Sequence, residues 1–235
     1  MMKYIVAISS AVYQMGGYRE EYLMKKRYLN ALDYNDVLSH YDARVEISET
    51  LQDLLKNGDK NKYSMLALGV SDPYGNYSAS QHGLGEKILS ATSTNKIFEL
   101  AENLNLAKTG EDARRIISSS NIQNIKISVG TEMAMLLQPS VHWLANSRSI
   151  WAYLLEIKGD VNVANEALEL YLSGSDESQM KYLIWSQIHE DMEKPLRAIA
   201  NQGISSASIS VVPNNVNSNI FIWADAIANA LYENF

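Results

Sequence analysis

The chain has 235 residues, of which 46% are hydrophobic and 20% charged, so it can bury a substantial core in one large domain or two small ones. Its formal net charge of −7 and pI near 5.1 argue against nucleic-acid binding, which draws most of its affinity from basic surface. The chain has no cysteine, which excludes disulfides, thiolate nucleophiles, iron–sulfur clusters and thiolate zinc sites.

The first apolar run lies in MMKYIVAISSAVY and is short, with Ser9 and Ser10 interrupting it, so it does not resemble a signal peptide. No run approaches the roughly 20 apolar residues that a membrane helix needs. We therefore expect a soluble, cytoplasmic protein with no membrane partner.

Four segments predict buried strands: residues 4–9, 63–70, 125–129 and 206–212. The second, YSMLALGV, is almost continuously apolar, as expected for a strand that is covered on both faces. Long helical patterns separate the four segments, which favours parallel pairing. The predicted fold class is helix-rich α/β, with a mainly parallel sheet of about four strands flanked by helices.

Helical periodicity covers most of the remaining chain. Helices are predicted over residues 18–31, 36–56, 84–107 (with a break at TSTN), 110–120, 140–158, 160–174, 175–203 and 219–233. Pro195 is expected to kink or end the first half of the longest of these helices. We expect one α/β domain over residues 1–235, with a helical subdomain over 131–203.

Polar residues follow three of the predicted strands. They are Ser9 and Ser10 after the first, Asp72 and His82 after the second, and Thr131 and Glu132 after the third. Ligands of open parallel sheets bind outside the carboxyl ends of the strands, where such loops converge. We therefore expect one pocket, with Asp72, His82 and Glu132 as catalytic residues; Ser9, Ser10, Gly83, Gly85 and Thr131 would bind the ligand.

The loop GVSDPYGNYSASQHGLGEK, residues 69–87, contributes most to this site. Its DPYG segment has the composition of a tight turn, which is sufficient to explain Asp72 without a catalytic role. Gly83 and Gly85 precede a helix and can turn backbone N–H groups toward an anion, although the spacing matches no dinucleotide or P-loop motif. His82 would act as a proton shuttle near neutral pH.

Two histidine–glutamate pairs, His82 with Glu86 and His189 with Glu193, have the spacing of neighbours on a helix face. Such pairs are usually surface electrostatic contacts, and the chain has neither a zincin helix nor an EF-hand loop. The sequence predicts no metal site and identifies no cofactor.

Three functions fit these features. The leading hypothesis is a small-molecule enzyme or binder whose polar ligand, with phosphate among the options, lies at the strand ends; the sequence does not decide whether it is an enzyme. The alternative is a non-catalytic protein–protein interaction or assembly module, such as a homo-oligomer, that uses the aromatic-rich helices 141–157 or 175–202. The third is a metal-dependent nuclease, which requires acids gathered near Lys87 or Lys126.

Overall fold

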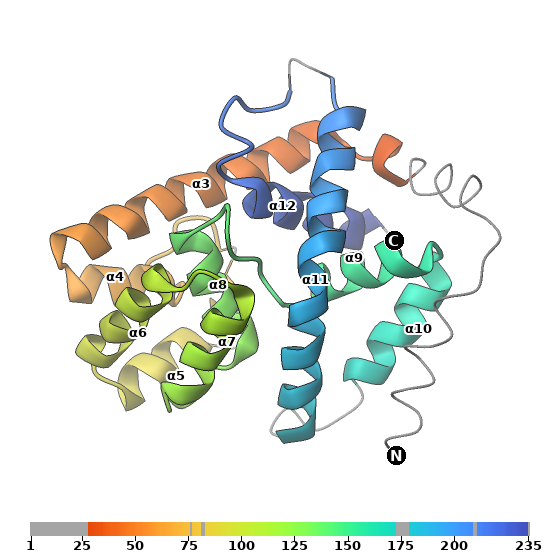
Figure 1. Cartoon of the computed structure of the whole chain (residues 1–235). Helices are drawn as coiled ribbons and strands as arrows, with labels where there is room; N and C mark the ends of the chain where they lie inside the picture. The colour runs from red at the N-terminus through yellow and green to blue at the C-terminus, as the bar shows by residue number, and fades with distance from the viewer. Residues whose placement is uncertain (1–27, 76, 81–82, 173–178, 209–210, 235) are drawn as a thin grey trace.

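The computed structural model describes residues 28–75, 77–80, 83–172, 179–208 and 211–234. In chain order, its helices are α3 (Tyr34–Asn57), α4 (Lys60–Ala67), α5 (Leu84–Ala91), α6 (Thr94–Leu106), α7 (Gly110–Ser119), α8 (Ile127–Leu137), α9 (Ser147–Lys158), α10 (Val161–Leu172), α11 (Gln179–Ser206) and α12 (Ile220–Asn234). Figure 1 shows α4–α8 gathered on one side and α9 and α10 on the other, with α11 and α12 between them.

The predicted α/β fold is wrong, because the residues that the structure describes contain no strand. Segment 63–70 forms the end of α4 and the turn after it. Residues 127–129 of segment 125–129 are the first residues of α8, and residues 125–126 precede it. Segment 206–212 contains the end of α11 and a turn, apart from residues 209–210, and residues 4–9 lie outside the described part of the chain. The predicted, mainly parallel sheet of about four strands is therefore absent from the described residues, whose regular secondary structure is helical.

Segment 63–70 is helical because its apolar residues also fit a helical period. The Asp59 side chain caps α4 by accepting the Lys62 backbone N–H at 3.2 Å. Within the helix, Tyr63, Leu66 and Ala67 are buried, a spacing of three and four residues. A short apolar run without clear alternation does not distinguish a buried strand from a buried helix, and the Asp59 cap favours the helix.

Segment 125–129 is the start of the most enclosed helix in the described part. In α8, ten of the 11 residues are buried, with Ser128 the exception. A helix that is apolar all round belongs in a core and shows no amphipathic period. The continuous run was therefore mistaken for a strand with both faces covered.

The strand predicted over segment 206–212 requires the preceding helix to end at Gly203, and it does not end there. Backbone hydrogen bonds of helical spacing continue past it, with the Ala207 N–H donating to the Gly203 carbonyl at 2.9 Å. A Cβ atom at Gly203 would lie 2.2 Å from Ile227 Cδ1, so the glycine allows α11 to pack closely on α12. Its role is close packing.

Helices with clear end signals are confirmed. The Asp33 side chain caps α3, and Gly58 ends the helix in the left-handed conformation with φ 71°. Asn146 and Ser149 form a capping box at the start of α9, and Gly159 follows its last turn. The break expected at TSTN separates α5 from α6.

In the C-terminal half, α9, α10, α11 and α12 lie on segments predicted to be helical, but residues 140–146 of the predicted helix 140–158 form a turn and a loop. Helix α11 continues through Pro195 as one helix. The limits of the expected subdomain, residues 131 and 203, fall inside α8 and α11. No helix in the described ranges combines the length and apolar character needed to cross a membrane.

Candidate functional site

The predicted catalytic residues occupy different surroundings. Glu132 is 2% exposed in the middle of α8. Asp72 lies in a surface turn, where its carboxylate accepts the Tyr74 backbone N–H at 2.9 Å, as the DPYG pattern indicates. His82, Ser9 and Ser10 lie outside the described residues.

The predicted ligand-binding residues Thr131, Gly83 and Gly85 make contacts within the protein. The Thr131 hydroxyl donates to the Ile127 carbonyl at 2.6 Å and accepts the Ala145 backbone N–H at 3.0 Å. Gly83 precedes α5 in the left-handed conformation, and the Gly85 N–H donates to the Ala79 carbonyl at 3.3 Å. These contacts join α8 and α5 to neighbouring loops.

Gly85 provides a test of this packing role. A Cβ atom there would lie 2.3 Å from the Leu68 carbonyl oxygen, a backbone atom that cannot move aside cheaply. We expect Gly85→Ala to lower the free energy of unfolding by about 1–3 kcal/mol in urea denaturation, and exposed Ser90→Ala on the same helix to change it by less than about 0.5 kcal/mol. Unchanged stability in Gly85→Ala would contradict the close approach.

A buried group of charged side chains surrounds Glu132. The Arg44 Nη2 of α3 donates to Glu132 Oε1 at 2.8 Å, and Arg44 Nε lies 3.6 Å from Asp225 Oδ2 of α12. His40 Nε2 lies 3.4 Å from the same Asp225 oxygen. We call Arg44, Glu132, Asp225 and His40 the Arg44 cluster; it joins three helices in the core.

Nearby backbone and aromatic groups complete the surroundings of the cluster. The Ser78 backbone N–H donates to Glu132 Oε2 at 3.0 Å. The Arg44 guanidinium carbon lies 5.2 Å from the centre of the Tyr77 ring, a cation–π distance. The hydroxyls of Tyr77 and Tyr63 are buried and lack a hydrogen-bond partner. Unpaired buried hydroxyls are uncommon in native proteins and indicate unused hydrogen-bonding capacity beside the cluster.

Helix geometry explains how the sequence positions these residues. The buried stripe of α3 contains Val37, Tyr41, Arg44, Ser48 and Leu51, and Arg44 thus takes a core position. His40 precedes Arg44 by one helical turn and shares its side of the helix. Glu132 and Asp225 are the lone charged residues of the mainly apolar segments Ile127–Leu137 and Ile220–Leu231.

The pKa values of the two carboxyl groups move apart. Burial raises the pKa of Glu132 despite the opposing charge of Arg44. Burial also acts to raise the pKa of Asp225, but the His40 hydrogen bond and the Arg44 charge outweigh it and hold that pKa below its usual value. The two acids share one guanidinium, and Asp225 is the more strongly held in the charged form.

The Arg44 cluster approaches the surface on one side. The side chains of Arg44 and Glu132 are 1% and 2% exposed, whereas those of Asp225 and His40 are 7% and 12% exposed. Arg148 at the start of α9 lowers the pKa of Asp225 through its charge, and its side chain is 29% exposed. Asp225 and His40 therefore form the end of the cluster that is nearer to solvent, and Arg44 and Glu132 form the end that is fully buried.

Further polar side chains continue along α12 from Asp225. Asn229 and Glu233 follow at intervals of four residues, and the Asn229 side-chain amide donates to Glu233 Oε1 at 3.2 Å. Glu233 also lies 4.0 Å from Arg148 Nη2. The Asn229 side-chain oxygen is buried without a hydrogen-bond partner. This polar row leads from the exposed end of α12 to the Arg44 cluster.

Within the described ranges, no three histidine, aspartate or glutamate side chains are grouped so that they could hold one metal ion. Arg44 instead contacts both buried carboxylates of its cluster. Comparison with known protein-family models, curated proteins and solved structures gives no match.

Proposed function

We propose that the protein binds a small polar molecule at the exposed end of the Arg44 cluster, beside His40, Asp225 and Arg148. The observation that carries this proposal is the convergence of one guanidinium, two carboxylates and one imidazole from three helices, with one end approaching the surface. Burying so many charged groups costs more than packing apolar ones, and titratable groups with shifted pKa values gather at functional sites.

The charges favour a ligand that donates hydrogen bonds, such as an amine. Asp225 is held ionised, and Glu233 adds a second carboxylate beside Arg148 at the end of the polar row. The unpaired Asn229 side-chain oxygen is a further acceptor. A primary amine matches these acceptors better than a phosphate does. If the ligand is a substrate, the imidazole of His40, oriented by Asp225, can transfer its proton.

A thermal-shift panel of small amines, amino acids, sugars and inorganic phosphate tests this function. We expect at least one amine to raise the melting temperature of the wild type, because a ligand that binds the folded state stabilises it by mass action. The shift should disappear in His40→Gln and Asp225→Asn and persist in Glu193→Gln, whose carboxylate is exposed on α11. A wild type that no amine stabilises, or a shift that survives both site variants, would overturn the proposal.

The interaction-module alternative receives less support from the described residues. An exposed apolar patch on segment 141–157 would favour it, but the two tryptophans of that segment, Trp143 and Trp151, are 4% and 1% exposed. The Trp151 indole N–H donates to the Asn165 side chain at 2.6 Å. Both rings therefore belong to the core. The nuclease hypothesis requires a metal-binding group of acids, which the described residues do not form.

A further inference from the structure

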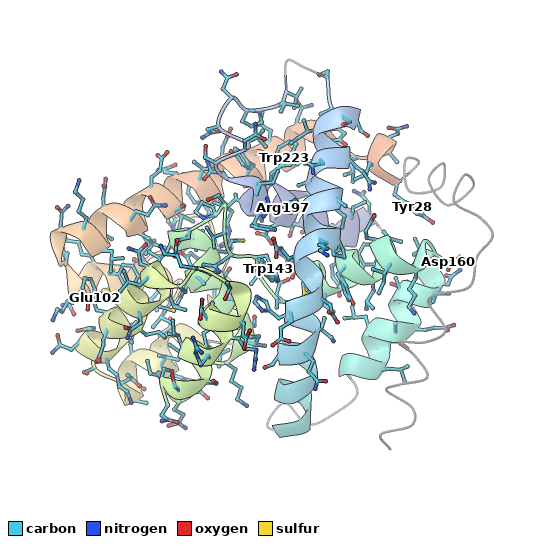
Figure 2. The ribbon with its side chains drawn as sticks, viewed as in Figure 1. Tyr28, Glu102, Trp143, Asp160, Arg197 and Trp223 are labelled. Carbon is cyan, nitrogen blue, oxygen red and sulfur yellow. The ribbon has the colours of Figure 1, made fainter. Side chains whose placement is uncertain are left out.

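A second polar junction lies where the loop between α8 and α9 meets α11. The Trp143 ring stacks on the His189 ring, with centroids 4.7 Å apart and planes 20° apart. The Trp143 indole N–H donates to the His189 carbonyl at 2.8 Å, and His189 Nε2 lies 3.3 Å from the Trp143 carbonyl. Figure 2 shows Trp143 beside α11. The two residues thus bind each other through both rings and both carbonyls.

The start of α7 closes over this pair. A Cβ atom at Gly110 would lie 2.6 Å from the Trp143 ring and 3.3 Å from His189 Cε1. From α12, the Phe221 ring lies 5.4 Å from Trp143 between centroids. The junction is therefore enclosed by α7, α11, α12 and the loop that carries Trp143.

Two histidines are buried in this junction. His142 and His189 are each 1% exposed. Because His189 Nε2 faces a carbonyl, we assign the ring proton to it, and Nδ1 is then a bare lone pair without a hydrogen-bond partner. Neither ring nitrogen of His142 makes a hydrogen bond of normal geometry. The surroundings of both rings therefore favour the neutral imidazole. A second proton on His189, at Nδ1, would have no hydrogen-bond acceptor.

The charged groups around the junction do not compensate for a proton. Lys108 and Asp112 carry opposite charges near His142, so their effects on its protonation oppose each other. Arg114 places a positive charge near His189. The nearby carboxylates already have partners, since Glu190 pairs with Arg114 at 2.7 Å and Asp112 pairs with Arg115.

The pKa values follow from this environment. Burial lowers the pKa of His189 most, and the charges of His142 and Arg114 act in the same direction; against the opposing effect of the Trp143 carbonyl, the pKa falls to about 4. Burial likewise lowers the pKa of His142, against the nearby Ala107 carbonyl and Asp112. The face of the Trp143 ring attracts a cation, but this attraction is weaker than the penalty for charging a completely buried imidazole.

We propose that His142, Trp143 and His189 form an acid-released latch, which holds the first half of α11 against α7 and opens when the two imidazoles take up protons. Pro195 lies six residues after His189 and lacks the N–H that would bond to the Asp191 carbonyl, so α11 has one backbone hydrogen bond fewer there, and we place the hinge of the opening at this point. Beyond it, Leu196, Ile199 and Ala200 are 2%, 3% and 0% exposed and remain packed. This latch is separate from the proposed binding site.

The sign of the pH effect follows from proton linkage. The pKa of His189 is about 4 in the closed state and near its ordinary 6.5 once the ring reaches water. The latch is therefore fully stable above pH 6.5 and weakens as the pH falls from 6.5 toward 4. At pH 5.0, His189 alone should raise the open-to-closed ratio roughly 30-fold over its value at pH 7.5.

Hydrogen exchange of the Trp143 indole N–H in the wild type tests this opening, because that proton bridges the latch. The internal reference is the Trp151 indole N–H, which donates to Asn165 at 2.6 Å. After correction for the intrinsic exchange rate, protection of Trp143 relative to Trp151 should fall by roughly tenfold or more between pH 7.5 and 5.0. An unchanged ratio would overturn the latch, whether both protons lose protection together or neither does.

A substitution identifies the group that takes up the proton. The side-chain amide in His189→Gln can still donate to the Trp143 carbonyl but does not titrate in this range, so the pH dependence of the protection ratio should be largely lost. Glu193→Gln, one turn along α11, should keep the wild-type dependence. Wild-type pH dependence in a folded His189→Gln protein would contradict the assignment. If that variant does not fold, His142→Gln should reduce the dependence, and an unreduced dependence would contradict the role of paired histidines.

Discussion

Replacing Arg44 with methionine is expected to lower the free energy of unfolding by about 3–5 kcal/mol at pH 7. Methionine fills a similar volume, so the loss comes from the charges of Glu132 and Asp225, which would stay buried without their guanidinium. Urea denaturation measures the change. Arg115→Met removes an exposed ion pair, because Arg115 is 70% exposed, and should cost less than about 1 kcal/mol.

The pH dependence of this loss separates an electrostatic cause from a packing defect. In Arg44→Met, the folded-state pKa values of Glu132 and Asp225 should rise above their unfolded values. Carboxyl groups of that kind are tolerated below the unfolded pKa and become destabilising as the pH rises. The stability difference between wild type and variant should therefore narrow from pH 7 toward pH 4. A difference that is constant with pH would indicate lost packing alone.

Truncating Trp143 to alanine should also cost about 3–5 kcal/mol, because the change leaves a cavity beside His189 and Phe221. Trp143→Phe keeps an aromatic ring and loses the indole N–H bond to His189, so we expect a loss of about 1–2 kcal/mol. Thermal and urea denaturation measure both losses.

The matched control for Trp143 is Tyr232→Ala. Tyr232 is 37% exposed and its ring packs against Trp151 in a T-shaped arrangement, so its removal should cost less than either change at Trp143. Equal losses in Trp143→Ala and Tyr232→Ala would contradict the placement of Trp143 in the core.

Helices with end signals in the sequence were predictable, and the type of the short apolar segments was not. The predicted helices 36–56 and 219–233 correspond closely to Tyr34–Asn57 and Ile220–Asn234. Segments 63–70 and 125–129 are apolar without clear alternation, and such runs fit a buried helix as well as a buried strand. The predicted sheet depended on these segments and on 206–212, so the error in fold class follows from them.

The candidate site was predictable only in part. The sequence predicts Glu132 at the polar end of a strand, and in the structure it is a lone acid within a buried helix. Arg44 is not among the predicted site residues, although its place in the apolar stripe of α3 is visible in the sequence. Its pairing with Glu132 spans 88 residues, and that of His40 with Asp225 spans 185. Contacts at such separations depend on how helices pack, which local periodicity does not reveal.

A double-mutant cycle on Arg44 and Glu132 tests most directly the claim that the buried charges of this cluster act together. Arg44→Met, Glu132→Gln and the double variant would be compared with the wild type by urea denaturation at pH 7. We predict a coupling free energy of about 2–3 kcal/mol, because the charges are in contact at 2.8 Å in the core. A coupling below about 0.5 kcal/mol, with additive losses, would contradict the cluster.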